Sequence, residues 1–261
     1  MKMWRKKLFQ LILAVFTLTS RATAAVVAEY NFNGTLSEST GNLSAASNHG
    51  TYFTADRFGN VNGALGFSGS QYATISGLGS FLSGKSSASV SGWYLFNSGR
   101  FTSGFMVTAP GQEGITPSLG IEVSAWGYLG GYMGVWYDVY TTAQPQQSAW
   151  HQITSVINQG SQPTLYLDGV EQPWMSPWVP SSLSNPIPSF TSDYGLGARI
   201  ENGNPVYFSR GGIDDLQFYD SALSSLQVSQ IYTQQLIPEP SALSLLAVGL
   251  GGLAMMRRRR S

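Results

Sequence analysis

Short β-type segments recur between Ala25 and Leu236, and they limit the fold more than any other feature of the sequence. Each segment is rich in β-branched, aromatic or alternating apolar residues, and clusters of Gly, Asn, Ser and Pro separate it from the next. The expected strands are 26–32, 71–76, 88–96, 118–125, 132–140, 150–157 and 164–168. Many short strands with frequent turn residues are typical of an antiparallel sandwich or barrel. The pair Asp168-Gly169, which lies between two such runs, predicts a tight hairpin turn.

One short helix is expected after these strands, within residues 220–232. Ser224 and Gln227 have the Ser-x-x-Gln spacing of a capping box, which stabilises the start of a helix. The apolar residues expected to pack against the strands are Leu223, Leu226 and Ile231. No other segment before residue 237 has a long helical period, so the body is expected to be all-β apart from this helix.

The distribution of charge and the lack of cysteine exclude several classes of function. The chain has no cysteine, so disulfides and thiolate chemistry are excluded. Nine of the 14 basic residues lie within the first 21 residues and at 257–260, whereas all 14 acidic residues lie between Glu29 and Glu239. The stretch between the basic ends therefore has a net charge of −9. Because nucleic-acid binding depends on basic residues that neutralise phosphates, we expect no nucleic-acid partner.

The first 24 residues have the layout of a secretory signal peptide. Four basic residues among the first seven precede an apolar core at 8–18, and Ala22-Thr23-Ala24 has the small-x-small pattern that signal peptidase reads. Cleavage is therefore expected after Ala24, with Ala22 and Ala24 as the recognised residues. The alternative is a short membrane anchor, although the apolar core is too short to span a bilayer well.

The last 25 residues combine three features in a fixed order. Residues 237–240 read Ile-Pro-Glu-Pro, residues 241–256 carry no charge, and four arginines follow at 257–260. As a helix the uncharged segment would be about 24 Å long, and snorkelling arginines would extend it toward the roughly 30 Å of a bilayer core. Since arginines prefer the cytoplasmic side, the body would lie outside. The alternative is a buried apolar helix, which four consecutive arginines oppose.

This arrangement resembles the PEP-CTERM sorting signal of bacterial proteins. The resemblance implies that an exosortase, which is an integral membrane enzyme, recognises the signal, cleaves the chain and transfers it to the envelope or to an exopolysaccharide matrix. The matching residues are Pro238, Glu239, Pro240, Arg257, Arg258, Arg259 and Arg260. The chain would thus consist of a signal peptide at 1–24, a body at 25–236 and a sorting signal at 237–261, with a transmembrane helix at 241–256.

The body resembles the laminin-G-like domain of the concanavalin A-like family. Six strings carry the resemblance in this order: 28–42, 63–76, 89–96, 150–157, 165–170 and 211–232. The last string, GGIDDLQFYDSALSSLQVSQIY, is the most specific of them. The resemblance implies a jelly roll of two antiparallel sheets that stack face to face.

Catalysis is not expected from the acidic residues. A retaining glycoside hydrolase needs two carboxyl groups about 5–5.5 Å apart. Several glutamates are isolated from other acidic residues in the sequence, among them Glu113, Glu122, Glu171 and Glu201. Asp214 and Asp215 are adjacent, so on a regular strand they would point to opposite faces. The two histidines, His49 and His151, form no recognisable triad with a nucleophile.

The laminin-G-like resemblance also implies a structural calcium ion at the edge of the sandwich. Its ligands would be Asp214 or Asp215, with Asn33 and Glu38 from the matching N-terminal loop. Strand alternation puts Asp214 on the core side, where an ion would satisfy its charge, and backbone carbonyls would supply further oxygen ligands. Relatives often have an aspartate where this chain has Glu38. The alternative is that Asp214 accepts backbone hydrogen bonds and binds no metal.

An aromatic cluster provides the candidate binding site for a ligand. The residues are Trp126, Tyr128, Tyr132 and Trp136. Aromatic rings stack on sugar faces, and Trp and Tyr suit surfaces that are partly apolar and partly wet. The alternative is that these rings pack in the core or are scattered over the surface.

These features together predict an exported, non-catalytic envelope or exopolysaccharide-matrix protein that binds carbohydrate or another surface protein. It would be anchored in the inner membrane until the exosortase acts. Two alternatives stay open, namely a glycan-processing enzyme of the same fold and a purely structural matrix component. Two carboxyl groups that face each other in a groove would favour the enzyme, whereas exposed Trp and Tyr rings would favour the carbohydrate-binding module.

Overall fold

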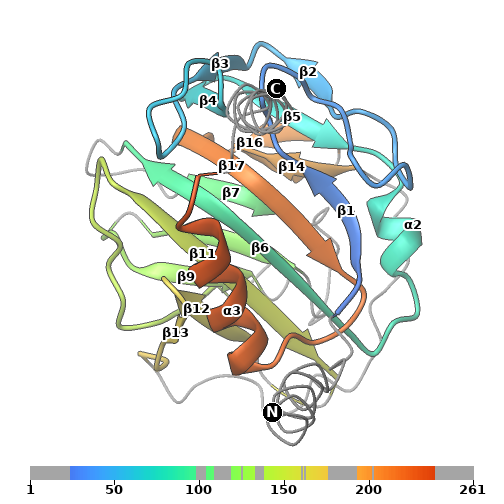
Figure 1. The fold of residues 1–261 in the computed structure, drawn as a ribbon, viewed down its shortest axis with the longest axis vertical. Helices are drawn as coiled ribbons and strands as arrows, with labels where there is room; N and C mark the ends of the chain where they lie inside the picture. Colours follow the sequence, from blue (N-terminus) through green and yellow to red (C-terminus); the bar gives the residue numbers. More distant parts are fainter. Residues whose placement is uncertain are drawn as a thin grey trace, which may run out of the picture.

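Two antiparallel β-sheets form the body of the protein (Figure 1). The computed structural model describes residues 24–97, 104–108, 119–124, 126–132, 138–159, 161, 163–175, 193–201 and 203–238. Most of the predicted signal peptide, including Ala22, lies outside these residues, as do Glu239, Pro240, the segment 241–256 and the four arginines. Within the described residues no helix is long and apolar enough to cross a membrane.

The larger sheet, which we name sheet A, contains eight of the described strands. Their order is β13-β12-β11-β6-β17-β4-β3, and β1 pairs with the second half of β17 on the edge whose first half pairs with β4. The strands are β1 (Val26–Tyr30), β3 (Tyr52–Thr54), β4 (Ala64–Ser68), β6 (Ser87–Phe96), β11 (Trp150–Asn158), β12 (Thr164–Leu167), β13 (Val170–Glu171) and β17 (Arg210–Tyr219).

The second sheet, sheet B, contains seven of the described strands in the order β10-β9-β8-β7-β14-β5-β2. The strands are β2 (Ser47–His49), β5 (Tyr72–Ile75), β7 (Gly104–Thr108), β8 (Gly120–Val123), β9 (Leu129–Tyr132), β10 (Asp138–Tyr140) and β14 (Tyr194–Leu196). A separate hairpin is formed by β15 (Arg199–Glu201) and β16 (Asn204–Val206). The all-β sandwich predicted from the strand pattern is therefore confirmed.

The main core lies between the two sheets and follows the alternation of side chains along the strands. In β6, Val90, Tyr94 and Phe96 belong to this core, whereas Ser91 and Trp93 face the other side. Burial of apolar side chains at about 25 cal/mol per Å² is the main stabilising term for such a sandwich. The outward residues of sheet A are also largely buried, because a helix covers them.

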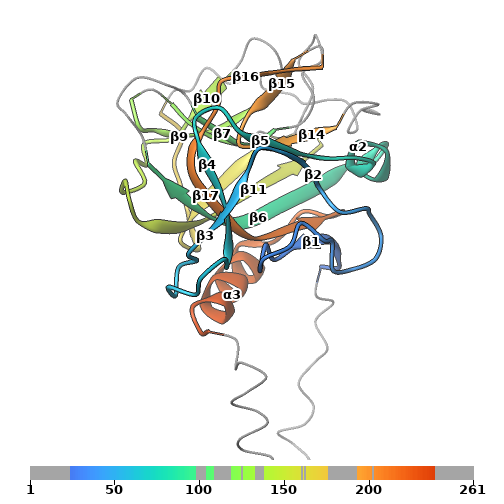
Figure 2. The ribbon, with the colours of Figure 1, turned by 90° about the horizontal axis from the view of Figure 1, so that it is seen from above.

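The helix that covers sheet A is α3 (Ser225–Gln235), and Figure 2 shows it on the side of sheet A that faces away from sheet B. Its N-cap is Ser224, and the capping box with Gln227 is formed as the sequence predicts. A second apolar cluster, which includes Tyr219, Leu223 and Val228, fills the space between α3 and the sheet. A shorter helix, α2 (Leu78–Leu82), follows β5 and was not expected from the sequence.

Two local expectations are wrong. The segment 132–140 is not one strand, because Tyr132 at the end of β9 pairs with Asp138 at the start of the antiparallel β10. Leu226 is 47% exposed, although it was expected to pack against the strands. The prediction failed because Val228 and Ile231 occupy the face of α3 that meets the sheet, together with Leu223 just before the helix.

Candidate functional site

Trp126 lies on a short turn between β8 and β9, at one end of sheet B. The backbone of the turn closes on itself, because Ser124 N–H donates to the Tyr128 carbonyl at 2.9 Å and Gly127 N–H donates to the Ser124 carbonyl at 2.8 Å. The Ser124 hydroxyl oxygen also accepts from the N–H groups of Trp126 and Tyr128, at 3.3 and 3.0 Å. Gly127 has a φ of 84°, which favours glycine, and it lets the chain reverse at this point.

The indole of Trp126 is displayed to solvent, since the residue is 77% exposed. The Gln144 amide donates to the carbonyl of Trp126 at 3.1 Å and so ties the turn to the segment after β10. The exposed ring is therefore carried by a turn with several fixed hydrogen bonds. A large apolar ring that is left in water on an ordered backbone is suited to stacking on a ligand.

The structure describes only part of the remaining predicted aromatic cluster. Tyr128 lies on the same turn as Trp126 and is half-buried. Tyr132 has its backbone at the end of β9, and its side chain lies outside what the structure describes. Trp136 lies in the segment 133–137, outside the described residues. The structure thus brings Trp126 and Tyr128 together on one turn.

A buried glutamate behind this turn was not singled out as a site residue in the sequence. Glu122 on β8 is fully buried and faces away from the main core, on the side opposite to Ile121. It is paired across the sheet with Gly130, and a methyl group at Gly130 would lie 2.9 Å from Glu122 Oε1 and 2.6 Å from the ring of Tyr140. Because Gly130 has no side chain, the Glu122 carboxylate and the Tyr140 ring can both lie over β9.

A second aromatic group lies on the same face of sheet B, at its opposite edge. The rings of His49 on β2 and Tyr72 on β5 stack at 4.2 Å with an angle of 4° between their planes. Phe208 approaches Tyr72 edge-on at 6.2 Å. Between these two edges of sheet B, the Thr108 hydroxyl donates to the carbonyl of Ala198, which directly precedes β15. The β15–β16 hairpin therefore covers the middle of this face of sheet B. Only the pairing of β2 with β5 brings His49 and Tyr72 together, and no sequence signal reveals it.

Asp214 and Asp215 do not point to opposite faces, and this corrects the expectation from strand alternation. The pairing of β17 with β6 shifts register between Asp214 and Gln217, and Asp215 has a φ of 47°. The extra residue of this bulge turns both carboxylates toward the same guanidinium. Arg57 Nη1 donates to Asp214 Oδ2 at 2.5 Å, and Arg57 Nη2 donates to Asp215 Oδ2 at 2.7 Å.

Arg57 also holds the end of α3, and we name its contacts the Arg57 clamp. Its Nε and Nη2 donate to the Gln235 carbonyl at 3.2 and 3.1 Å. The guanidinium carbon lies 4.7 Å from the centre of the Trp93 ring, and Trp93 Nε1 donates to Gln235 Oε1 at 2.9 Å. Burial, and next the Asp215 carboxylate, raise the pKa of Asp214, whereas the Arg57 guanidinium opposes them and favours the ionised form.

Three of the four residues proposed as calcium ligands have other partners in the structure. Glu38 accepts hydrogen bonds from the backbone N–H groups of Glu29, Thr40, Gly41, Asn42 and Leu43, at 2.7 to 3.4 Å. Asn33 lies exposed in the loop after β1, and both aspartates belong to the Arg57 clamp. Among the described residues no group of three or more His, Asp or Glu side chains could hold a metal ion. Calcium binding stays a prediction.

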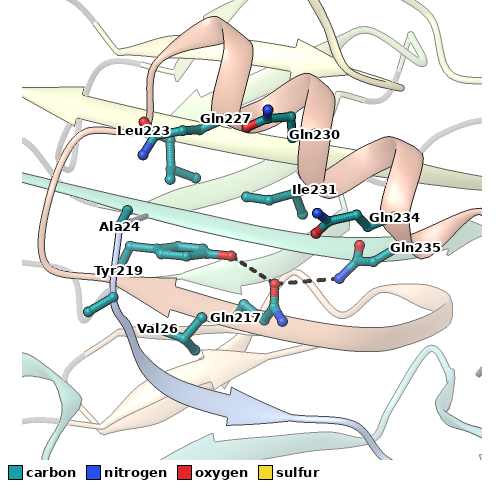
Figure 3. Close-up of a pocket in the computed structure, with 11 residues that line it drawn as sticks. Ala24, Val26, Gln217, Tyr219, Leu223, Gln227, Gln230, Ile231, Gln234 and Gln235 are labelled. Carbon is teal, nitrogen blue, oxygen red and sulfur yellow. Dashed lines mark hydrogen bonds between the residues drawn. The ribbon is translucent and has the colours of Figure 1, made fainter. Parts of the chain in front are cut away.

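A groove of about 440 Å³ lies between α3, the start of β1 and the outward face of β17 (Figure 3). The Tyr219 hydroxyl donates to Gln217 Oε1 at 2.8 Å, and the Gln235 amide approaches the same oxygen at 3.4 Å. The lining residues are Ala24, Ala25, Val26, Gln217, Tyr219, Leu223, Gln227, Gln230, Ile231, Gln234 and Gln235. Because these side chains carry no charged group, the groove offers neutral hydrogen-bonding partners and no acid or base.

Comparison with known proteins agrees with this architecture. A laminin G family model, described as the concanavalin A-like lectin/glucanases superfamily, matches residues 67–229. No curated protein matches the chain.

Several solved structures share the fold at low sequence identity. Domain 4 of the extracellular arabinanase AbnA from Geobacillus stearothermophilus, in complex with arabinotriose, has a TM-score of 0.59 at 21% identity and covers 80% of this chain and 99% of its own. Trypanosoma rangeli sialidase has a TM-score of 0.61 at 12% identity, over 81% of this chain and 33% of its own. The binding domain of Paraclostridial Mosquitocidal Protein 1 has a TM-score of 0.62 at 15% identity, over 81% of this chain and 52% of its own.

The chain thus spans one third of the sialidase and about half of the mosquitocidal binding domain that it matches. At these identities the likeness concerns the fold. The family match covers more than half of the chain, and its range runs from the end of β4 into α3. With its two antiparallel sheets and the helix packed on sheet A, this chain belongs to the concanavalin A-like lectin/glucanases superfamily.

Proposed function

We propose that this chain is an exported bacterial envelope or exopolysaccharide-matrix protein whose body binds carbohydrate without catalysis. The observation that carries the proposal is the indole of Trp126, which is 77% exposed on a turn held by the Ser124 hydroxyl and by Gln144. A pre-positioned ring loses little conformational entropy when a sugar stacks on it, so more of the contact energy appears as affinity. Tyr128, on the same turn, would extend the contact surface.

The family relationship supports a carbohydrate as the ligand. The arabinanase domain is described in complex with arabinotriose, and the mosquitocidal domain is described as a binding domain. Both match most of this chain in fold. A neutral oligosaccharide also suits an acidic body, because it carries no charge that the body would repel.

The contacts that Asp214 and Asp215 make favour a non-catalytic role. Asp214 and Asp215 are the closest acidic pair in the sequence, but the Arg57 guanidinium binds both and the end of α3 lies over them. A glycosidase needs one carboxyl group that can donate a proton and a second that faces the sugar. A pair tied to an arginine beneath a helix does not meet that need. The alternative proposals are a glycan-processing enzyme and a purely structural matrix component.

The proposed route to the cell surface depends on the two ends of the chain. The signal peptide at 1–24 would direct export, and the PEP-CTERM signal at 237–261 would hold the body at the inner membrane as an exosortase substrate. The residues of these signals that the structure describes are Ala24, Ile237 and Pro238. They border the body closely, since β1 begins at Val26 and α3 ends at Gln235. Glu239, Pro240 and Arg257 to Arg260 would be read by the enzyme.

Glycan binding by a Trp126→Ala variant tests the carbohydrate proposal. A glycan array, which includes arabinotriose, would identify a ligand for the wild-type body, and calorimetric titration of that glycan would give its affinity. We expect Trp126→Ala to weaken binding about tenfold, which corresponds to about 1.4 kcal/mol, and to leave the melting temperature unchanged because the ring is exposed.

The matched control is Val170→Ala, at a 63% exposed apolar residue in the β12–β13 hairpin, and it should keep wild-type affinity. Equal affinity of Trp126→Ala and wild type, or no glycan bound by the wild type, would contradict the proposal.

A further inference from the structure

The short distance along the chain between α3 and the proposed membrane span limits the orientations that the anchored body can adopt relative to the bilayer. Gln235 is the last residue of α3, and the uncharged segment begins at residue 241. Six residues reach at most about 22 Å when fully extended. The headgroup layer on one side of a bilayer is about 5–7 Å thick. The end of α3 must therefore lie within about 15 Å of the lipid surface, which is less than the diameter of a body of this size.

The Arg57 clamp makes this end of α3 a fixed part of the body. Arg57 binds the Gln235 carbonyl and the two β17 carboxylates at once, and Trp93 binds the Gln235 side chain. The end of α3 therefore cannot unwind and lengthen the tether unless these contacts are lost. Since the tether is short and its attachment is rigid, the surface around the attachment point must face the bilayer.

That surface has the chemistry of a lipid contact. Val61 and Phe58, which lie in the turn next to Arg57, are 84% and 37% exposed, and Leu236 and Ile237 are 47% and 70% exposed. We name these four residues the apolar patch. The whole of α3 has no charged side chain, although the body is acidic. The uncharged α3 meets less repulsion from anionic headgroups than the acidic parts of the body would. One carboxylate, that of Asp56, lies in the turn that carries Phe58 and Val61, where it accepts from the backbone N–H groups of Phe58 and Asn60.

We propose that the apolar patch and the exposed flank of α3 rest on the phospholipid surface, so that sheet B faces away from the membrane. This inference rests on the proposed span at 241–256. Because sheet A separates α3 from sheet B (Figure 2), the Trp126 turn is displayed on the far side of the sandwich. The anchored protein thus offers its candidate sugar site to the space beyond the membrane.

Single-cysteine labels test this orientation, because the natural chain contains no cysteine. The full chain is reconstituted into vesicles of phosphatidylethanolamine and phosphatidylglycerol, with a fluorescent label at Val61→Cys or at Thr142→Cys. Both positions are exposed, and Thr142 lies next to β10 of sheet B. Val61 is far from the tail in sequence, so its distance from the lipid depends on the fold. A spin label on the lipid headgroups then quenches labels that lie near the membrane surface.

We expect the Val61 label to be quenched at least about threefold more strongly than the Thr142 label, because spin-label quenching requires close approach and the two stacked sheets alone are about 10 Å apart. The substitution Arg57→Met should reduce this difference, since it frees the end of α3. Equal quenching at the two positions, or stronger quenching at Thr142, would overturn the proposed orientation.

Flotation of the vesicles separates this inference from the proposed anchor. If the full chain does not float with the vesicles while a fused, known membrane span makes it float, the proposed function of the tail is wrong. If the full chain floats and the Val61 label is no more quenched than the Thr142 label, the anchor stands and the orientation is wrong. Circular dichroism of both labelled variants should match that of the wild type, because neither side chain belongs to the core.

Discussion

Arg57 is expected to contribute strongly to stability although it lies outside the main core. Its side chain is 9% exposed and neutralises Asp214 and Asp215, whose side chains are 4% and 25% exposed. In Arg57→Met the apolar stem stays but two adjacent carboxylates lose their counter-charge. We expect the free energy of unfolding to fall by about 3–5 kcal/mol, as is typical when one partner of a buried ion pair is removed. Urea denaturation followed by fluorescence measures this change.

The ion pair of Lys85 with Asp220 provides the control, since these side chains are 41% and 31% exposed. Lys85→Met should cost less than about 1 kcal/mol, because solvent screens exposed pairs. If Arg57→Met costs no more than Lys85→Met, the clamp does not hold α3 in the way described. A further substitution of Asp214→Asn in the Arg57→Met background should restore part of the lost stability, since it removes one of the unpaired charges.

Glu38 should make the stability of the protein depend on acid pH. Burial raises the pKa of Glu38, but hydrogen bonds from the Thr40 side chain and from the backbone of Glu29, Thr40 and Leu43 outweigh it and lower the pKa to about 2. The unfolded chain therefore binds the proton more tightly, and the stabilisation by Glu38 is complete above about pH 4.5 and is lost as the pH falls toward 2.

The variant Glu38→Gln isolates this effect. At pH 7 we expect it to be less stable than the wild type by about 2 kcal/mol, the scale of hydrogen bonds to a charged group. The difference should shrink between about pH 4.5 and 2, because a protonated glutamate resembles glutamine. Urea denaturation of both proteins over this range measures the difference. A difference that stays constant with pH would mean that the carboxylate charge does not stabilise the loop.

At the scale of single residues, the sequence predicts some features of the candidate sites and leaves others out. Trp126 was predicted to belong to an aromatic ligand site, and its role in binding stays a prediction. Nothing in the sequence predicts that its ring would be 77% exposed. The shared orientation of Asp214 and Asp215 depends on a bulge that leaves no simple pattern in the sequence. Arg57 lies 157 residues before Asp214, so only the fold brings these partners together.

At the scale of elements, α3 is the one whose start is most clearly encoded. The Ser224 hydroxyl accepts from the N–H of Gln227, and the Gln227 side chain accepts from the N–H of Ser224. We expect Ser224→Ala to lower the free energy of unfolding by about 1 kcal/mol, which is a fall of about 2–4 °C in melting temperature for a body of this size. Calorimetry of the body measures it.

Ser229→Ala is the matched control for this prediction, because Ser229 is an exposed serine in the middle of the same helix. It should change the stability by no more than about 0.5 kcal/mol. A loss in Ser229→Ala as large as that in Ser224→Ala would show that the hydroxyl at the cap has no special role.

Strands with strong β-type patterns were predicted well, and short strands were not. The segments that became β6, β11 and β12 were found to within two residues. The hairpin at Asp168-Gly169 was also correct, with φ angles of 50° and 78° at these residues. In contrast β2, β3 and β16 have three residues each. Such strands are defined by their partners across the sheet, and a window of three residues holds too little pattern to reveal them.

At the scale of the whole molecule, the two-sheet fold could be predicted, but the distribution of its surfaces could not. The strand pattern and the six matching strings led to the sandwich. The sequence did not reveal that α3 and the start of β1 share one groove on sheet A, or that the Trp126 turn belongs to the other sheet. These relations depend on pairings between segments that are far apart along the chain, such as β1 with β17.

The pairing of β1 with β17 joins the first strand of the body to the last one. Ala28 lies opposite Phe218, so about 190 residues separate the partners. Loops of this length close slowly compared with local hairpins. In a polypeptide that crosses a membrane amino end first, β1 emerges long before its partner does. If this chain is exported as proposed, sheet A would be completed only after nearly the entire body has crossed the membrane, and the chain would stay unfolded enough to be transported until then.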